Sequence, residues 1–116
     1  MDHKDLDVWK KGMELVERVY SMSRAFPDSE RFGLTSQIRR AAVSIPSNIA
    51  EGAARKSDKE LLQFLSIAIG SLAELETQYL IAIRLGFLEK DKSLTNLISD
   101  EKQLLLGFRN YIKNKL

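Results

Sequence analysis

The stretch SDKELLQFLSIAIGSLAELETQYLIAIRLG, residues 57–86, decides the fold of this 116-residue chain. It opens with Ser57 and, three residues later, Glu60, which is the capping-box pattern that starts a helix. It closes at Gly86, a residue type that commonly follows the end of a helix. Between these signals, apolar residues recur at helical spacing over about half of the circumference, and the centre of this arc is formed by Leu61, Leu65, Ala68, Leu72, Leu75 and Tyr79. We expect one helix over residues 58–85, and so wide an arc predicts contacts with two neighbouring elements, which can include another subunit.

Three further amphipathic segments are predicted at residues 5–25, 34–56 and 93–115. The first ends before Pro27, because a proline disfavours the helical conformation of the residue that precedes it. The second contains Pro46, but its apolar stripe keeps its phase from Ile45 to Ile49, which predicts one kinked helix. Four amphipathic helices with short connections predict an all-α fold, a single up-down-up-down antiparallel four-helix bundle over residues 1–116.

The sequence lacks the residues that several kinds of catalytic site require. The absence of cysteine excludes disulfides, thiol nucleophiles and cysteine-ligated zinc. His3 is the only histidine, so a hydrolase triad has no plausible base and a metal site lacks convergent ligands. Glycine-rich phosphate loops are absent as well. We therefore expect no enzymatic activity, no cofactor, no metal and no small-molecule substrate.

The sequence also lacks a membrane-directed segment. No stretch approaches the roughly 20 uninterrupted apolar residues of a transmembrane helix. The first residues are not followed by the apolar region of a signal peptide. We expect a cytoplasmic protein without membrane contact.

Basic residues are concentrated on the segment that contains Pro46. The net charge of the chain is only +2, but residues 31–59 contain six basic and two acidic residues. At 100° per residue, several polar side chains fall within about a quarter-turn of one another, with Asn48 at the edge: Arg40, Ser44, Ser47, Glu51 and Arg55. Arg39 lies about 100° away from this stripe, and Lys56 and Lys59 extend the positive charge beyond the end of the helix.

This polar stripe has two interpretations. It can be an ordinary solvated helix face, or it can be a recognition surface in which arginine binds phosphate or carboxylate and serine and asparagine supply adaptable hydrogen bonds. No aromatic residue interleaves with the basic groups, so base stacking is not predicted.

Two carboxylates fall among apolar residues. Glu76 projects between Leu72 and Leu80, and a lone buried carboxylate is costly, so we expect a structural ion pair with Arg39 or Arg40. Glu101 presents a similar pattern on the last segment, where we expect the apolar arc to open to solvent.

The run LTSQIRRAAVSIPSNIAEG at residues 34–52 resembles the signature of a family of small bacterial four-helix bundle proteins. These proteins were first noticed as reading frames within intervening sequences of 23S ribosomal RNA genes. Leu6, Val8, Trp9 and the run GSLAELET at residues 70–77 are similar to that family as well.

The resemblance implies a four-helix bundle that assembles into a ring, most often a homopentamer. It also implies similarity to the accessory variability protein of diversity-generating retroelements, which works with a reverse transcriptase and RNA through a basic surface. The corresponding surface here would be formed by Arg39, Arg40, Arg55, Lys56 and Lys59.

Three functional hypotheses follow. The first is a non-enzymatic oligomeric module that binds RNA or a nucleic-acid-processing protein through the basic surface of the second helix. The alternative is a protein–protein interaction scaffold with no nucleic-acid role. An enzyme with its chemistry at Glu76 is disfavoured by the missing catalytic partners.

Overall fold

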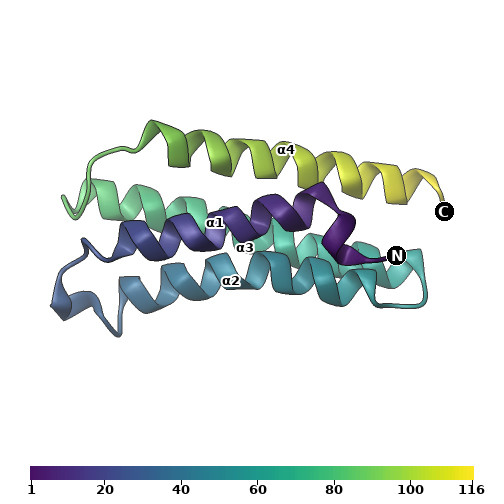
Figure 1. Cartoon of the computed structure of the whole chain (residues 1–116), viewed down its shortest axis with the longest axis horizontal. Helices are drawn as coiled ribbons and strands as arrows, with labels where there is room; N and C mark the ends of the chain where they lie inside the picture. The colour runs from purple at the N-terminus through teal and green to yellow at the C-terminus, as the bar shows by residue number, and fades with distance from the viewer.

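Four long helices account for most of the chain in a computed structural model that describes residues 1–116 (Figure 1). They are α1 (Asp7–Ser23), α2 (Leu34–Ala53), α3 (Asp58–Arg84) and α4 (Lys92–Asn114), with short 3-10 turns η1 (His3–Asp5) and η2 (Asp28–Glu30) before α1 and α2. The structure contains no strands, so the predicted all-α fold with four helices is confirmed. The helix ends lie within three residues of the predicted ones.

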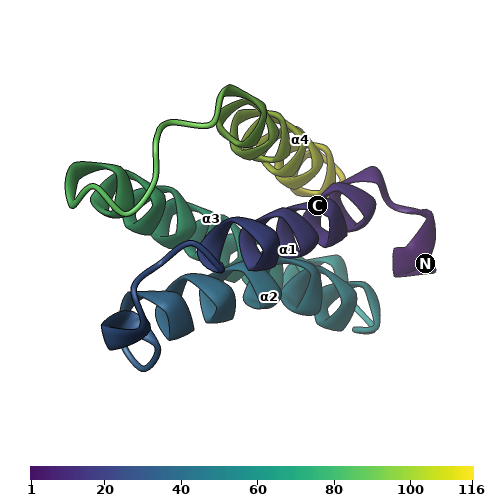
Figure 2. The same ribbon diagram turned by 60° about the vertical axis from the view of Figure 1, so that its left-hand side comes forward.

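The four helices form a closed bundle. Each helix packs against the next along the chain, and α1 also packs against α4. The backbones of the diagonal pairs, α1–α3 and α2–α4, do not come close to each other. Successive helices run in opposite directions (Figures 1 and 2). The most extensive contact is between α2 and α3. The result is an elongated molecule of 46 × 25 × 20 Å.

The core lies where the four apolar stripes meet. Every helix contributes fully buried side chains, including Leu15, Val19, Ile38, Ile45, Ile49, Leu65, Leu75, Tyr79, Leu94, Leu105 and Ile112. Gly52 lets α2 approach α3 closely, because a Cβ there would lie 2.8 Å from the Phe64 side chain and 3.0 Å from Leu61. Pro46 is buried within one continuous α2, so the expectation of a single helix is confirmed.

The ends of α3 follow the sequence signals. The backbone N–H of Glu60 donates to the Ser57 hydroxyl over 3.2 Å. Gly86 has a φ of +76°, and the N–H of Phe87 returns to the carbonyl of Ala82 at 2.9 Å. This arrangement is a Schellman motif, and glycine accommodates its left-handed residue without a Cβ penalty. Phe87 then packs on Phe26, with ring centroids 5.9 Å apart.

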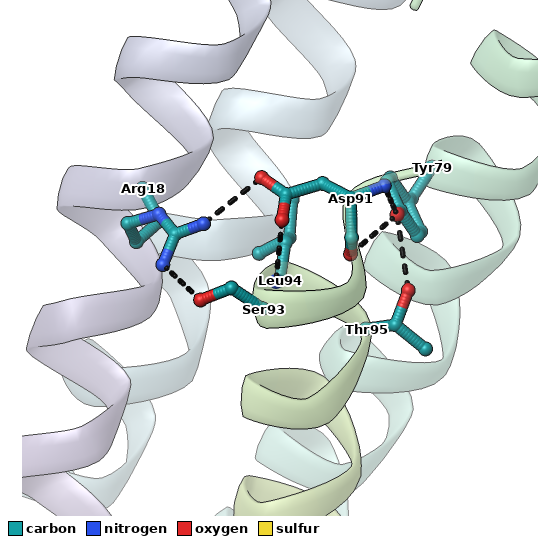
Figure 3. A network of polar contacts seen from close by, with 6 residues as sticks. All are labelled: Arg18, Tyr79, Asp91, Ser93, Leu94 and Thr95. Atoms are coloured by element: carbon teal, nitrogen blue, oxygen red, sulfur yellow. Dashed lines mark hydrogen bonds and ion pairs between the residues drawn. The ribbon is translucent and has the colours of Figure 1, made fainter. Parts of the chain in front are cut away.

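A polar network fixes the start of α4 against α1 (Figure 3). Asp91 caps α4 by accepting the N–H of Leu94 at 3.2 Å, and its other oxygen accepts from Arg18 at 2.9 Å. Arg18 also donates to Ser93 at 2.9 Å. The N–H of Leu94 first, and then the Arg18 guanidinium, hold the pKa of Asp91 below its ordinary value.

The same network reaches α3 through the buried Tyr79. Its hydroxyl accepts the backbone N–H of Asp91 at 2.8 Å and lies 3.0 Å from the Thr95 hydroxyl (Figure 3). Because these groups satisfy one another and join three helices, we assign them a structural role.

No helix in the molecule combines the length and the apolarity that crossing a bilayer requires.

Candidate interaction surface on α2 and α3

A polar groove of about 510 Å³ lies between α2 and α3. Six of its eight lining residues are polar; the full lining is Phe32, Ser36, Gln37, Arg40, Ala41, Ser44, Ser71 and Glu74. Residues three and four positions apart share a helix face, which is why Ser36, Arg40 and Ser44 of α2 face Ser71 and Glu74 of α3.

The inner part of this groove is held by hydrogen bonds. The hydroxyls of Ser44 and Ser71 lie 2.9 Å apart. The Asn48 amide donates to the carbonyl oxygen and to the hydroxyl of Ser44, both at 2.8 Å. Ser44 and Asn48 were predicted as recognition residues, and the structure places both half-buried in the contact between the two helices. Their bonds therefore stiffen the groove, while its outer residues remain available.

Arg40 is the cation of the groove. Its side chain is exposed and forms no ion pair within the chain, although Glu74 lines the same groove. An unpaired guanidinium offers five donors in a planar fork that suits phosphate or carboxylate.

Arg39 has a different environment. Its Nε donates to the Ser23 hydroxyl at 2.8 Å, and its guanidinium lies 4.7 Å from the centroid of the Tyr20 ring. It therefore ties α2 to α1, on the side away from α3. The predicted ion pair of Arg39 or Arg40 with Glu76 is not formed.

The remaining predicted residues lie along α2 and at the turn into α3. Arg55 pairs with Glu51 at 3.8 Å and covers the Phe64 ring at 4.8 Å. Lys56 and Lys59 are exposed at the turn into α3. Ser47 lies at a separate groove of about 310 Å³ with residues of α1. The predicted polar stripe is thus divided between two sides of α2: Arg40 and Ser44 line the groove with α3, and Ser47 lines the groove with α1.

The structure corrects the prediction for Glu76. This side chain is half-buried and lines a small cavity of about 60 Å³ that also contacts Ile98 and Lys102 of α4. It faces α4 and not α2, so neither Arg39 nor Arg40 is within reach. The prediction of a buried ion pair was wrong because the wide arc of α3 serves two neighbours.

Glu101 is the buried carboxyl of this protein, and the expectation that it reaches solvent was wrong. It is 0% exposed, and neither carboxyl oxygen has a hydrogen-bond partner. Burial raises its pKa to about 8, against a smaller opposing effect of the Lys11 charge. Its spacing of four residues from Leu97 and from Leu105 puts it within the apolar stripe of α4, but this spacing alone does not indicate burial.

An aromatic residue that the helical wheel missed completes the groove. Phe32 is 89% exposed and lines the same groove as Arg40, and the Arg31 guanidinium lies 5.4 Å from its ring centroid. No aromatic residue interleaves with the basic groups along α2 itself, as the sequence indicated, and Phe32 adds one from outside the helix. Phe32 lies in the connection before α2, which a search for helical periodicity does not cover.

No group of three or more histidine, cysteine, aspartate or glutamate side chains is arranged to hold a metal ion. The side chains that line the α2–α3 groove offer hydrogen bonding, ion pairing and stacking.

Comparison with known proteins supplies a family. A family model described as "23S rRNA-intervening sequence protein" matches residues 4–107. Among solved structures, a protein of unknown function from the S23 ribosomal protein family of Bacteroides thetaiotaomicron superposes with a TM-score of 0.80 at 24% sequence identity. The match covers 88% of this chain and 97% of that one, and at this identity it shows the fold alone. No curated protein matches the sequence.

Proposed function

Because the chain belongs to the family of 23S rRNA-intervening sequence proteins, as the run at residues 34–52 indicated, we propose that it is a non-enzymatic oligomeric module that binds RNA. The binding surface in this proposal is the basic surface of α2 and of the turn into α3, defined as Arg40, Arg55, Lys56 and Lys59. The observation that carries the proposal is the exposed, unpaired guanidinium of Arg40 in a groove rich in hydrogen-bonding groups.

Phosphate contacts explain why such a surface suits RNA. Arginine and lysine displace counterions from a nucleic-acid backbone, which favours binding and makes it dependent on salt. Of the four cations, only Arg55 has an acidic partner, at 3.8 Å and exposed to solvent, and a pair of this kind is weak. All four side chains are therefore available to phosphates.

The assembly in this proposal is a ring-shaped homopentamer. Support comes from the C-terminal end of α3, where Leu80 and Ile81, together with Leu85 just beyond the helix, are each at least 41% exposed. Leu80 and Ile81 line the same surface groove, and a contiguous group of exposed apolar side chains is typical of an interface. The number five comes from the family resemblance.

Light scattering followed by RNA titration tests the proposal. We expect a mass near five times the 13.2 kDa of the chain, and RNA binding that weakens steeply between low and moderate salt. The triple variant Arg40→Gln, Lys56→Gln, Lys59→Gln should flatten the salt dependence, by about 0.7 in slope for each lost phosphate contact. Lys90→Gln, which removes an exposed lysine outside this basic surface, is the matched control. A monomer contradicts the assembly, and salt-insensitive or absent binding contradicts the RNA role.

A protein-interaction scaffold is the second candidate, and one observation favours it. The groove of about 310 Å³ between α1 and α2 is mostly apolar and contains Trp9, Met13 and Val43. A groove of this kind suits the apolar face of an amphipathic helix of another protein. Capture of a partner protein that survives nuclease treatment would favour this function over RNA binding.

A further inference from the structure

Phe32 is the most exposed aromatic side chain of the molecule, and its position is fixed by the surrounding turn. An 89% exposed phenyl ring contributes almost nothing to the core. The turn beneath it is ordered, because the Glu30 carboxylate accepts the N–H of Leu34 at 3.0 Å and so caps α2. Gly33 permits this approach, since a Cβ there would lie 2.9 Å from Glu30 Oε1. The ring is thus presented to solvent by a defined backbone.

The groups beside Phe32 are those that a nucleotide requires. Arg31 lies at the ring, and Arg40 lies one to two helical turns into α2 on the wall of the same groove. Aromatic rings provide stacking surfaces for bases, and arginines bind the adjoining phosphates. Gln37 and Glu74 add an amide and a carboxylate, which can pair with the edge of a base.

The mixed charge of the groove argues against a simple anion. A free phosphate at Arg40 would meet the carboxylate of Glu74 across the groove. A nucleotide carries its negative charge on the phosphate and N–H donors on its base, so one ligand can satisfy both Arg40 and Glu74. The groove is also too polar for a typical apolar ligand, since only two of its eight lining residues are hydrophobic.

We propose that the α2–α3 groove binds an unpaired RNA nucleotide, with the base stacked on Phe32 and its phosphate at Arg40. This inference rests on the proposed RNA-binding function and adds the site and the single-stranded class of the ligand. Bases within a duplex are stacked on one another, so Phe32 contributes only where a base is unpaired.

A labelled single-stranded RNA of about ten nucleotides tests the inference against the matched duplex. Phe32→Ala should weaken binding of the single strand by about fivefold or more, leave its salt slope unchanged, and leave duplex binding unchanged. The control is Tyr111→Ala, which removes another exposed aromatic ring that has a cation over it, Lys115 at 5.5 Å, outside the groove. This control should bind like the wild type.

A second variant reports stacking directly. Phe32→Trp should retain binding of the single strand. Addition of the single strand should quench the tryptophan fluorescence of this variant more than it quenches the wild type, whose only tryptophan is Trp9. Light scattering should give Phe32→Ala the same mass as the wild type.

The outcomes separate the inference from the proposed function. Wild-type binding that is salt-sensitive but unaffected by Phe32→Ala overturns the inference and leaves the RNA role intact. A changed mass of Phe32→Ala, or no quenching of Phe32→Trp, also overturns it. Absence of any salt-sensitive binding by the wild type instead contradicts the proposed function itself.

Discussion

Gly12 of α1 makes room for Glu101 of α4. A Cβ at position 12 would lie 3.1 Å from Glu101 Oε2, so the carboxyl packs directly against the bare backbone of the neighbouring helix. The same point of α1 lies close to Pro46 of α2. Three helices therefore converge around a buried acid that has no hydrogen-bond partner.

Because Glu101 is buried, we expect the stability of the protein to fall as the pH rises. The folded-state pKa of Glu101 is raised to about 8 from an ordinary value of 4.5, so between these values the folded protein holds a proton that the unfolded chain has lost. The contribution of Glu101 to the free energy of unfolding is fully present below its ordinary pKa and is lost as the pH rises through about 8. The free energy of unfolding falls by up to about 1.4 kcal/mol per pH unit in this range. Urea unfolding at a series of pH values, at one chain concentration, measures this slope.

Glu101→Gln isolates the contribution of this carboxyl. The amide has nearly the same shape but does not titrate, so the variant should show a shallower dependence of unfolding free energy on pH. Glu89→Gln, which removes an exposed carboxylate from the connection before α4, should parallel the wild type. Equal slopes for Glu101→Gln and the wild type would mean that Glu101 is charged and solvated in the folded protein.

Gly12→Ala should destabilise the bundle although alanine is the better helix former. The added Cβ would be 3.1 Å from Glu101 Oε2 and 3.4 Å from Pro46, and overpacking of this kind costs about 1–3 kcal/mol. Gly107→Ala is the matched control, because nothing lies within 4 Å of a Cβ on that glycine of α4. The control should gain about 0.5–1 kcal/mol from helix propensity. Thermal unfolding of the two variants compares them, and a stabilised Gly12→Ala would show that α1 and α4 are farther apart than described.

The helices themselves could be predicted from the sequence because their signals are local. Ser57 and Gly86 act through bonds to residues a few positions away, and the apolar stripes need only a helical period. The position of Glu101 in its stripe was equally visible. Its burial was not, because the room for it comes from Gly12, which is far away in the sequence.

The candidate site was predicted only in part. A helical wheel gives angles around α2 but not where its neighbours lie, so it grouped Ser47 with Arg40 although they border different grooves. Phe32 lies before α2, so the helical pattern did not include it. Periodicity carries no information about where a connecting segment places its side chains.

Asp91 should stabilise the start of α4 by two separable effects. Asp91→Ala removes both the cap on Leu94 and the attraction to Arg18, and loss of such a cap typically costs about 1 kcal/mol. Asp91→Asn keeps a capping oxygen and should cost less. Because the folded-state pKa of Asp91 is lowered, its stabilisation is present above the ordinary value and is lost as the pH falls through the folded one.

Urea unfolding of both Asp91 variants at neutral and at acidic pH measures these effects. The difference in the free energy of unfolding between Asp91→Ala and the wild type should decrease as the pH is lowered. This is opposite to Glu101, whose contribution to stability decreases as the pH is raised. A difference that is constant over the whole pH range would show that the carboxylate charge contributes nothing to the cap.

Arg39 and Arg40, adjacent in the sequence, should respond to substitution in opposite ways. Arg39→Gln removes the hydrogen bond to Ser23 and the contact with the Tyr20 ring, so we expect about 1–2 kcal/mol lower stability and an unchanged salt slope of RNA binding. Arg40→Gln removes an exposed, unpaired side chain, so its stability should stay within about 0.5 kcal/mol of the wild type. Its RNA affinity should fall and its salt slope should decrease by about 0.7. Each variant controls for the other, and equal effects on RNA binding would mean that the two arginines act through the general charge of α2 and not through the groove.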